Sequence, residues 1–169
     1  MMKTMRQLHQ FQLWCIEQTG ATCVWCPEDL IQRCRQVFVS TEAKPSHLQN
    51  NVVAALGDLQ DVNRVEVEVS TKSGYSLDAV VVYRGNRVGV EVDGPSHFVG
   101  QSQSPNGNTI SKHRQVCALE NLKLVSVPYW EWDAIEKEGS SKERKENKEQ
   151  YLQNLLDETI VASVKVEPR

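Results

Sequence analysis

The alternation of apolar and charged residues between positions 64 and 94 constrains this chain more than any other feature. Val65, Val67 and Val69 alternate with acidic residues, and two further alternating runs flank Gly85-Asn86. A period of two is typical of β-strands, and a short connection that begins with glycine is typical of a hairpin turn. The sequence therefore predicts three consecutive strands, the last two of which form a hairpin.

The turn residues also predict which side chains face each other across this hairpin. With Arg84 and Arg87 on either side of the turn, Asp78 lies directly opposite Asp93, and Glu91 shares their face. The other face of the hairpin is entirely apolar. Like charges that oppose each other across strands destabilise a sheet by a few tenths to ~1 kcal/mol. We therefore expect these three carboxylates to be supplied with a cation or a proton.

Helical periodicity precedes and follows the three strands, which predicts an α/β fold with a mixed sheet. In chain order we expect helices within residues 1–60, the three strands, a helix over 112–121 capped by Thr109 or Ser111, a strand over 123–128 and a helix over 151–160. The charged run 136–149 is interpreted as a solvated linker or the start of that last helix.

Charge and hydropathy exclude several classes of protein. The 169 residues carry a formal net charge of −3, so the chain lacks the global positive field of a basic nucleic-acid-binding arm, and any such contact must be local. No apolar run approaches the ~20 residues that a membrane helix needs, so we expect no membrane insertion. The chain has five cysteines, an odd number that cannot all pair within one chain, and this favours a reducing compartment. Lys3 and Arg6, without a nearby acid, weakly suggest an organellar targeting segment.

The three carboxylates of the hairpin have a direct chemical interpretation. Asp78 and Glu91, with Asp93 nearby, are hard oxygen ligands that suit Mg²⁺. Lys112 or His97 could then orient an attacking water or neutralise a phosphate. The alternative is that Asp78 and Glu91 are edge residues that face solvent.

Residues 74–132 resemble the RAP domain, a module associated with organellar RNA. The matching elements are Leu77-Asp78, the run Glu91-Val92-Asp93-Gly94-Pro95-Ser96-His97-Phe98, Thr109, Lys112 and the segment Val127-Pro128-Tyr129-Trp130-Glu131-Trp132. On this resemblance we divide the chain into an N-terminal helical extension (1–44), a RAP domain (45–132) and a charged linker with a C-terminal helix (133–169).

RAP domains in turn look like the restriction-endonuclease superfamily, especially its very-short-patch-repair branch. This resemblance implies a core of one helix, three strands, a helix and a strand, with Asp78 and Glu91 as the metal ligands. The superfamily pattern has lysine where this chain has Asp93, and an aspartate cannot donate protons to a phosphate as lysine does. One alternative is that Lys112 or His97 replaces that lysine. The site would then be active with Mg²⁺ as cofactor, and its catalytic residues would be Asp78, Glu91, Asp93 and Lys112. The other alternative is that the site does not cut nucleic acid and needs no cofactor.

Basic and aromatic residues of the same region are candidates for RNA contact. They are Lys72, Arg84, Arg87, His97, Phe98, Lys112, His113 and Arg114. We expect Lys112, His113 and Arg114 at a helix N-terminus, where the dipole favours phosphate, and the aromatic rings could stack on bases. Their ordinary alternatives are surface charges and core aromatics.

The cysteine spacing offers a second candidate site. Cys23 and Cys26, flanked by Cys15 and Cys34, suggest zinc or a redox pair. If Cys15 and Cys34 lie within helices, each is roughly 12 Å from the intervening loop, which favours buried thiols instead.

Three functions remain open from the sequence. The first is a non-catalytic RNA-binding protein of an organelle, with ribosomal RNA and the other proteins of a mitochondrial ribosome as partners. The second is a Mg²⁺-dependent endonuclease acting on RNA or DNA, and the third is a protein-only scaffold in a large assembly. The resemblance favours the mitochondrial matrix, with the chloroplast as the alternative.

Overall fold

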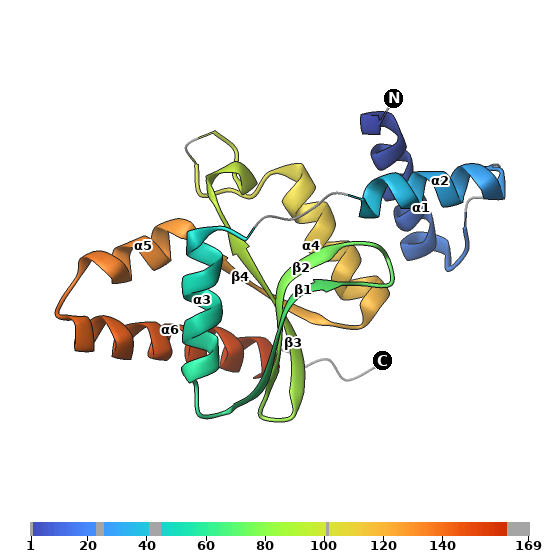
Figure 1. Ribbon diagram of the computed structural model, residues 1–169. Helices are drawn as coiled ribbons and strands as arrows, with labels where there is room; N and C mark the ends of the chain where they lie inside the picture. Colours follow the sequence, from blue (N-terminus) through green and yellow to red (C-terminus); the bar gives the residue numbers. More distant parts are fainter. Residues whose placement is uncertain (1, 23–25, 41–44, 101, 162–169) are drawn as a thin grey trace.

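The computed structural model describes residues 2–22, 26–40, 45–100 and 102–161, and it contains a four-stranded mixed sheet with helices on both faces (Figure 1). In chain order the elements are α1 (Met2–Thr19), α2 (Glu28–Val39), α3 (His47–Asp58), β1 (Val62–Ser70), β2 (Ser76–Tyr83), β3 (Asn86–Asp93), the 3₁₀ helix η1 (Pro95–His97), α4 (Gly107–Glu120), β4 (Lys123–Pro128), α5 (Tyr129–Lys137) and α6 (Ser141–Val161). The predicted α/β class and the predicted order of helix, three strands, helix and strand are confirmed.

The sheet has the order β1-β2-β3-β4, and its two faces carry separate cores. The first three strands pair antiparallel, whereas β4 lies parallel to β3 after a crossover through α4. Val52 of α3, Trp132 of α5 and Leu156 of α6 pack on one face. Leu13 of α1 and Val116 of α4 pack on the other face.

The hairpin between β2 and β3 has a different register from the one the sequence predicted. Tyr83 lies opposite Asn86, so Arg84 and Gly85 form the two-residue turn, and Arg87 is a strand residue. Both turn residues have positive φ, 46° and 77°, which is the conformation whose twist suits the flanking strands. The predicted register was therefore wrong by two residues. An even shift leaves every side chain on its predicted face.

The corrected register changes which carboxylates are neighbours. Ala79 lies opposite Val90, so the next pair along the two strands is Asp78 and Glu91. The expected opposition of Asp78 and Asp93 is wrong. The three carboxylates still share one face of the sheet, as the alternation predicted.

Helix α4 begins earlier than the sequence predicted. Asn106 caps it, because its Oδ1 accepts hydrogen bonds from the backbone N–H groups of Asn108 (3.0 Å) and Thr109 (3.1 Å). The Thr109 hydroxyl instead donates to the carbonyl of His97 (3.0 Å). The predicted cap at Thr109 or Ser111 was wrong. Lys112 and the two residues after it consequently lie inside the helix, away from the N–H groups of its first turn.

The C-terminal part of the chain is more helical than the sequence suggested. The charged run is helical from Ser141, so of the two interpretations the start of the last helix is confirmed. The sequence did not indicate α5, which begins after Pro128 and buries Trp132. No helix within the described ranges is both long enough and apolar enough to cross a bilayer. The division of the chain at residues 44 and 132 stays a prediction.

The first two helices form a lobe, the α1–α2 lobe, that rests on the turn between β1 and β2. Nε2 of His9 lies 2.9 Å from the carbonyl oxygen of Ser73, which can only accept, so Nε2 carries the proton. The Arg35 guanidinium donates to the carbonyl of Lys72 (3.2 Å), and the Phe38 ring meets that of Tyr75 edge-on. The lobe is thus fixed to one end of the sheet.

Candidate functional site

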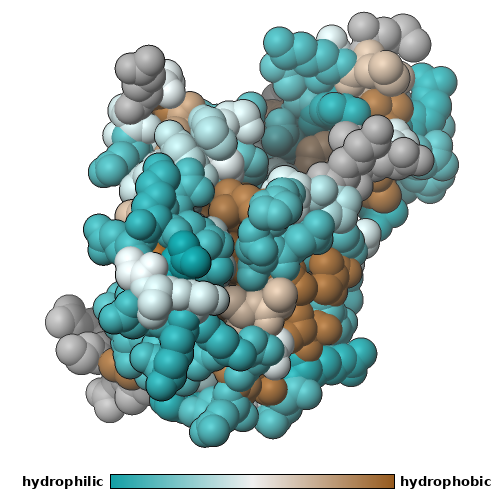
Figure 2. Space-filling model, turned by 60° about the vertical axis from the view of Figure 1, so that its left-hand side comes forward, coloured by the Kyte–Doolittle hydropathy of each residue, from teal (hydrophilic) through white to brown (hydrophobic). Residues whose placement is uncertain are grey.

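A cleft of about 960 Å³ lies between the α1–α2 lobe and the end of the sheet. Its acidic, basic and histidine side chains come from five elements: Lys3 and Arg6 of α1, Glu68 of β1, Asp78 of β2, His97 of η1 and Lys112 of α4. Figure 2 shows the hollow between the lobe and the rest of the molecule. The cleft is large enough for an extended ligand.

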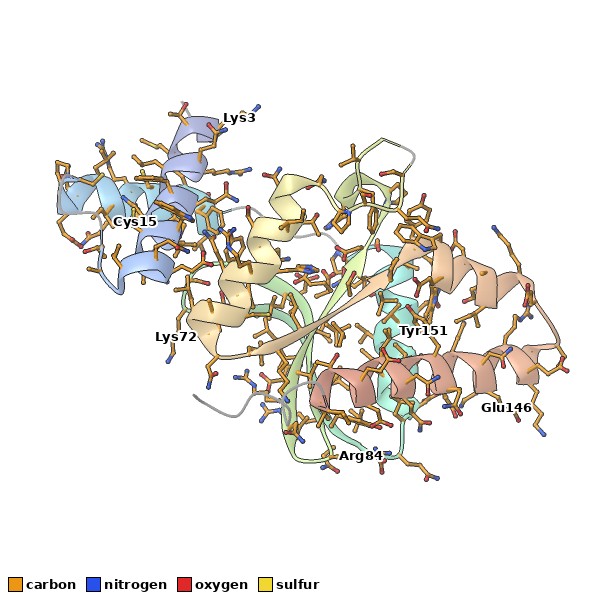
Figure 3. The ribbon with its side chains drawn as sticks, turned by 180° about the vertical axis from the view of Figure 1, so that it is seen from behind. Lys3, Cys15, Lys72, Arg84, Glu146 and Tyr151 are labelled. Carbon is orange, nitrogen blue, oxygen red and sulfur yellow. The ribbon has the colours of Figure 1, made fainter. Side chains whose placement is uncertain are left out.

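Three basic side chains, Lys3, Arg6 and Lys112, line this cleft. Lys3 projects from the beginning of α1 (Figure 3). Nε of Arg6 is buried and has no hydrogen-bond partner among the described residues. The acid Glu68 is already engaged, because its carboxylate accepts hydrogen bonds from Gln49 (2.5 Å) and Ser76 (3.4 Å). Because Lys112 is paired with Glu91, the donors that the lining offers to an anionic ligand come first from Lys3 and Arg6.

Beneath the cleft, Glu91 and Asp93 are almost fully buried and each has a cationic partner. Both side chains are only 1% exposed. Nζ of Lys112 donates to Oε2 of Glu91 at 2.6 Å, and Nδ1 of His97 lies 2.7 Å from Oδ1 of Asp93. The hydroxyl of Ser126 donates to Oδ2 of Asp93. The expectation of a cation or a proton therefore holds for two of the three carboxylates, since Asp78 accepts a hydrogen bond from a backbone N–H group instead.

The pKa values of these two carboxyl groups shift in opposite directions. Burial raises the pKa of Glu91 to about 7, although Lys112 opposes this shift. Burial would also raise the pKa of Asp93, but His97 and Ser126 outweigh it, and this pKa is lowered. Asp93 therefore carries its charge in the folded protein, and it raises the pKa of His97 in return.

Asp78, the neighbour of Glu91 across the two strands, faces the cleft. Its Oδ2 accepts a hydrogen bond from the backbone N–H of Val92 at 2.7 Å. Burial raises the pKa of Asp78, and the Val92 hydrogen bond partly offsets this. Asp78 is thus reachable from the cleft, whereas Glu91 is not among the residues that line it.

The pair Asp78 and Glu91 does not fit Mg²⁺ well. This ion needs near-octahedral oxygen coordination and keeps several waters. One oxygen of Glu91 is bound to Lys112, and Glu91 is closed to solvent. An oxygen of Asp78 is bound to the backbone. We therefore derive no hydrolytic step through a metal held by these two residues.

The candidate RNA-binding residues fall into separate regions of the molecule. His97, Phe98 and Lys112 lie at or beside the cleft, whereas Arg84 and Arg87 belong to the hairpin turn and its following strand. Lys72 lies in the turn between β1 and β2, and Figure 3 shows it well apart from Arg84. These residues do not form one continuous surface.

Ion pairs inside the protein occupy two of the candidate arginines. The Arg84 guanidinium contacts Asp61 at 2.7 Å and Asp157 at 2.6 Å. Nε of Arg114 lies 2.8 Å from a carboxylate oxygen of Glu17, which joins α4 to α1. Both arginines therefore have structural partners in the folded chain.

His113 and Phe98 also point inward. Nε2 of His113 lies 3.8 Å from Asp93, and burial lowers the pKa of His113. Phe98 is 8% exposed, and its ring meets that of Trp130 edge-on with centroids 4.4 Å apart. Its contact with a base, like the other proposed RNA contacts, stays a prediction.

The cleft includes Lys3 and Arg6, which were not among the candidate residues. Their spacing of three places them on one face of a helix, and that was the available signal. The sequence did not indicate that α1 would dock beside α4. Cys23 lies outside the described residues, so a site containing Cys23 and Cys26 stays a prediction.

Comparison with known proteins agrees with the motifs. Residues 90–155, from β3 into α6, match the RAP domain. The chain is similar to "RAP domain-containing protein, chloroplastic" of Oryza sativa subsp. japonica, with 40% identity over 86 residues. The matched segment covers 51% of this chain but only 12% of that relative. Most of the motifs that indicated this module lie in β3, η1, α4, β4 and α5, so the sequence and the comparisons agree that residues 90–155 are similar to the RAP domain.

Proposed function

We propose that this protein is a non-catalytic RNA-binding protein of an organelle, and that it holds the RNA backbone in the cleft. The observation that carries this proposal is the lining of the cleft. Basic groups come from both the α1–α2 lobe and the RAP domain. Lys112 also forms an ion pair with the buried carboxylate of Glu91.

The contacts we propose are phosphate contacts to Lys3, Arg6 and Lys112, with His97 as a fourth group. Such contacts need only a local patch, so they are compatible with the net charge of −3. Arg6 supports this role because its buried Nε lacks a partner within the described part of the chain. A guanidinium is also well suited to bidentate contact with phosphate.

The proposal also names a cellular compartment and a class of RNA. The rice relative is named chloroplastic, and RAP domains are associated with organellar RNA. We propose ribosomal RNA as the ligand and the mitochondrial matrix as the compartment, with the chloroplast as the alternative. A fluorescent fusion expressed with organelle markers, and sequencing of RNA crosslinked to the full chain, would test both.

The experiment that tests RNA binding is a salt titration. Single-stranded binding that neutralises three phosphates predicts a slope of log K against log salt of about −2, or about −0.7 per contact. Lys3→Gln/Arg6→Gln should reduce this slope to about −0.7 and weaken binding in fluorescence anisotropy.

The matched control is Arg64→Gln/Lys142→Gln, which also removes one arginine and one lysine charge, but from exposed positions outside the cleft. It should leave the slope and the affinity nearly unchanged. Equal slopes for the two double variants would refute the cleft as the binding site. If no RNA binds at any salt concentration, the scaffold function remains.

One observation favours the endonuclease as a second candidate, because Asp78 lines the cleft and could meet a phosphate there. RNA incubated with the wild type in Mg²⁺ or in a chelator tests this. Cleavage that needs Mg²⁺ and is lost in Asp78→Asn would support a nuclease. Intact RNA with retained binding would support the non-catalytic function.

A further inference from the structure

Two carboxylates and one imidazole converge between β3 and α4, beneath the floor of the cleft. A carboxylate oxygen of Glu91, one of Asp93 and a ring nitrogen of His113 all lie within 4.8 Å of one another. The two acids are 1% exposed, and His113 is partly buried. This cluster, the β3–α4 cluster, does not include Asp78.

Three buried atoms of the cluster lack hydrogen-bond partners in the described part of the chain: Oε1 of Glu91, Oδ1 of Asp93 and Nε2 of His113. Of these, Oδ1 of Asp93 lies 2.7 Å from the ring nitrogen Nδ1 of His97. More than nine in ten buried polar groups in proteins are hydrogen-bonded. An unpaired carboxylate oxygen and an unpaired imidazole nitrogen at one place therefore indicate a missing ligand.

The chemistry of the cluster favours a cation over a water molecule. The atoms of Glu91 and Asp93 are acceptors, and a neutral imidazole offers the lone pair of Nε2. One water can donate only two hydrogens, whereas a divalent cation accepts all three lone pairs.

We propose that Glu91, Asp93 and His113 bind a divalent transition-metal ion such as Mn²⁺ or Zn²⁺. The imidazole distinguishes this site from one for Mg²⁺, because nitrogen ligands suit transition metals. The ion would link β3 to α4. Lys112 and His97, which line the cleft and pair with Glu91 and Asp93, would lie between the ion and the cleft. Its role is therefore structural, and it does not depend on RNA binding.

The test is a Mn²⁺ titration of the full chain, with free Mn²⁺ measured by electron paramagnetic resonance. Mn²⁺ is the probe because thiolates select softer ions, so the cysteines compete little. The wild type should bind a single ion. His113→Asn and Asp93→Asn should each weaken binding roughly tenfold or more, since even outer-shell partners of metal ligands contribute that much.

His47→Asn is the matched control, because His47 is an exposed histidine on α3. It should bind Mn²⁺ as the wild type does. Circular dichroism shows whether each variant is folded, and Mn²⁺ should broaden the amide resonances around residue 113 in the folded wild type. The proposal is overturned if the wild type binds no Mn²⁺ at millimolar concentration, or if His113→Asn binds it unchanged.

Discussion

His9 makes the attachment of the α1–α2 lobe sensitive to pH. The side chain is 4% exposed, its Nε2 donates to the carbonyl of Ser73, and its Nδ1 is buried without a partner among the described residues. Burial lowers the pKa of His9, and the nearby Arg35 adds to this shift, although the Ser73 hydrogen bond opposes it. The folded protein therefore holds this imidazole neutral.

The sign and size of the effect follow from proton linkage. The ordinary pKa of histidine is about 6.5, so below this pH the unfolded chain binds a proton that the folded chain does not. The free energy of unfolding is unaffected above about pH 6.5 and falls as the pH is lowered toward the folded-state pKa. One group contributes at most ~1.4 kcal/mol per pH unit, which limits the loss to ~2 kcal/mol by about pH 5.

The assay compares His9→Gln with the wild type by urea unfolding at about pH 7.5 and about pH 5. Glutamine keeps an N–H donor for Ser73 but does not titrate. His97 and His113 titrate in both proteins, so the difference between them isolates His9. Hydrogen exchange of α1 should rise at low pH in the wild type alone.

His47→Gln, at an exposed histidine, is the control and should retain the full pH dependence of the wild type. If His9→Gln loses as much stability on acidification as the wild type does, the reasoning is refuted. Because Lys3 and Arg6 are carried on α1, weakened docking of the lobe should also reduce RNA affinity at low pH.

Three further substitutions test the packing, the ion pairs and the metal site. In Gly89→Ala the new Cβ would lie 2.6 Å from Cδ1 of Leu124, so we expect the free energy of unfolding to fall by ~1 kcal/mol or more; an unchanged urea midpoint would contradict this. Arg84→Gln should change RNA affinity less than about twofold, because Arg84 belongs to the hairpin turn and does not line the cleft; a large loss in anisotropy would restore it as a phosphate contact. Lys112→Met removes the ammonium 2.6 Å from Glu91, so Mn²⁺ should bind more tightly and RNA more weakly; weaker Mn²⁺ binding would count against the cluster as a metal site.

The sequence predicted the faces of the hairpin correctly but not its register. Alternation with a period of two depends only on local geometry, so Asp78, Glu91 and Asp93 were correctly placed on one face. The register depends on which residues adopt positive φ. Arg84 does so here, with φ of 46°, while its side chain contacts Asp61 and Asp157. No local rule favours arginine at that position over Asn86.

The cleft was less predictable than the strands because it depends on contacts between distant segments. The hydrogen bond from His9 to Ser73 joins residues 64 positions apart. Helical spacing indicated α1, but a periodic pattern does not identify the surface on which a helix docks. The start of α4 was missed for a more local reason, since Asn106, Thr109 and Ser111 are all capping residues and only the fold selects among them.

The position of the lobe has a consequence for the RNA binding that we propose. Residues 90–155 match the RAP domain, and they contain Lys112 and His97 on one wall of the cleft. Lys3 and Arg6, on the opposite wall, lie outside that segment. If phosphate contacts provide most of the affinity, then two of the three cationic contacts come from a part of the chain that the RAP match does not include. We therefore expect the RAP segment to position the RNA and the α1–α2 lobe to set the strength of binding and its dependence on salt.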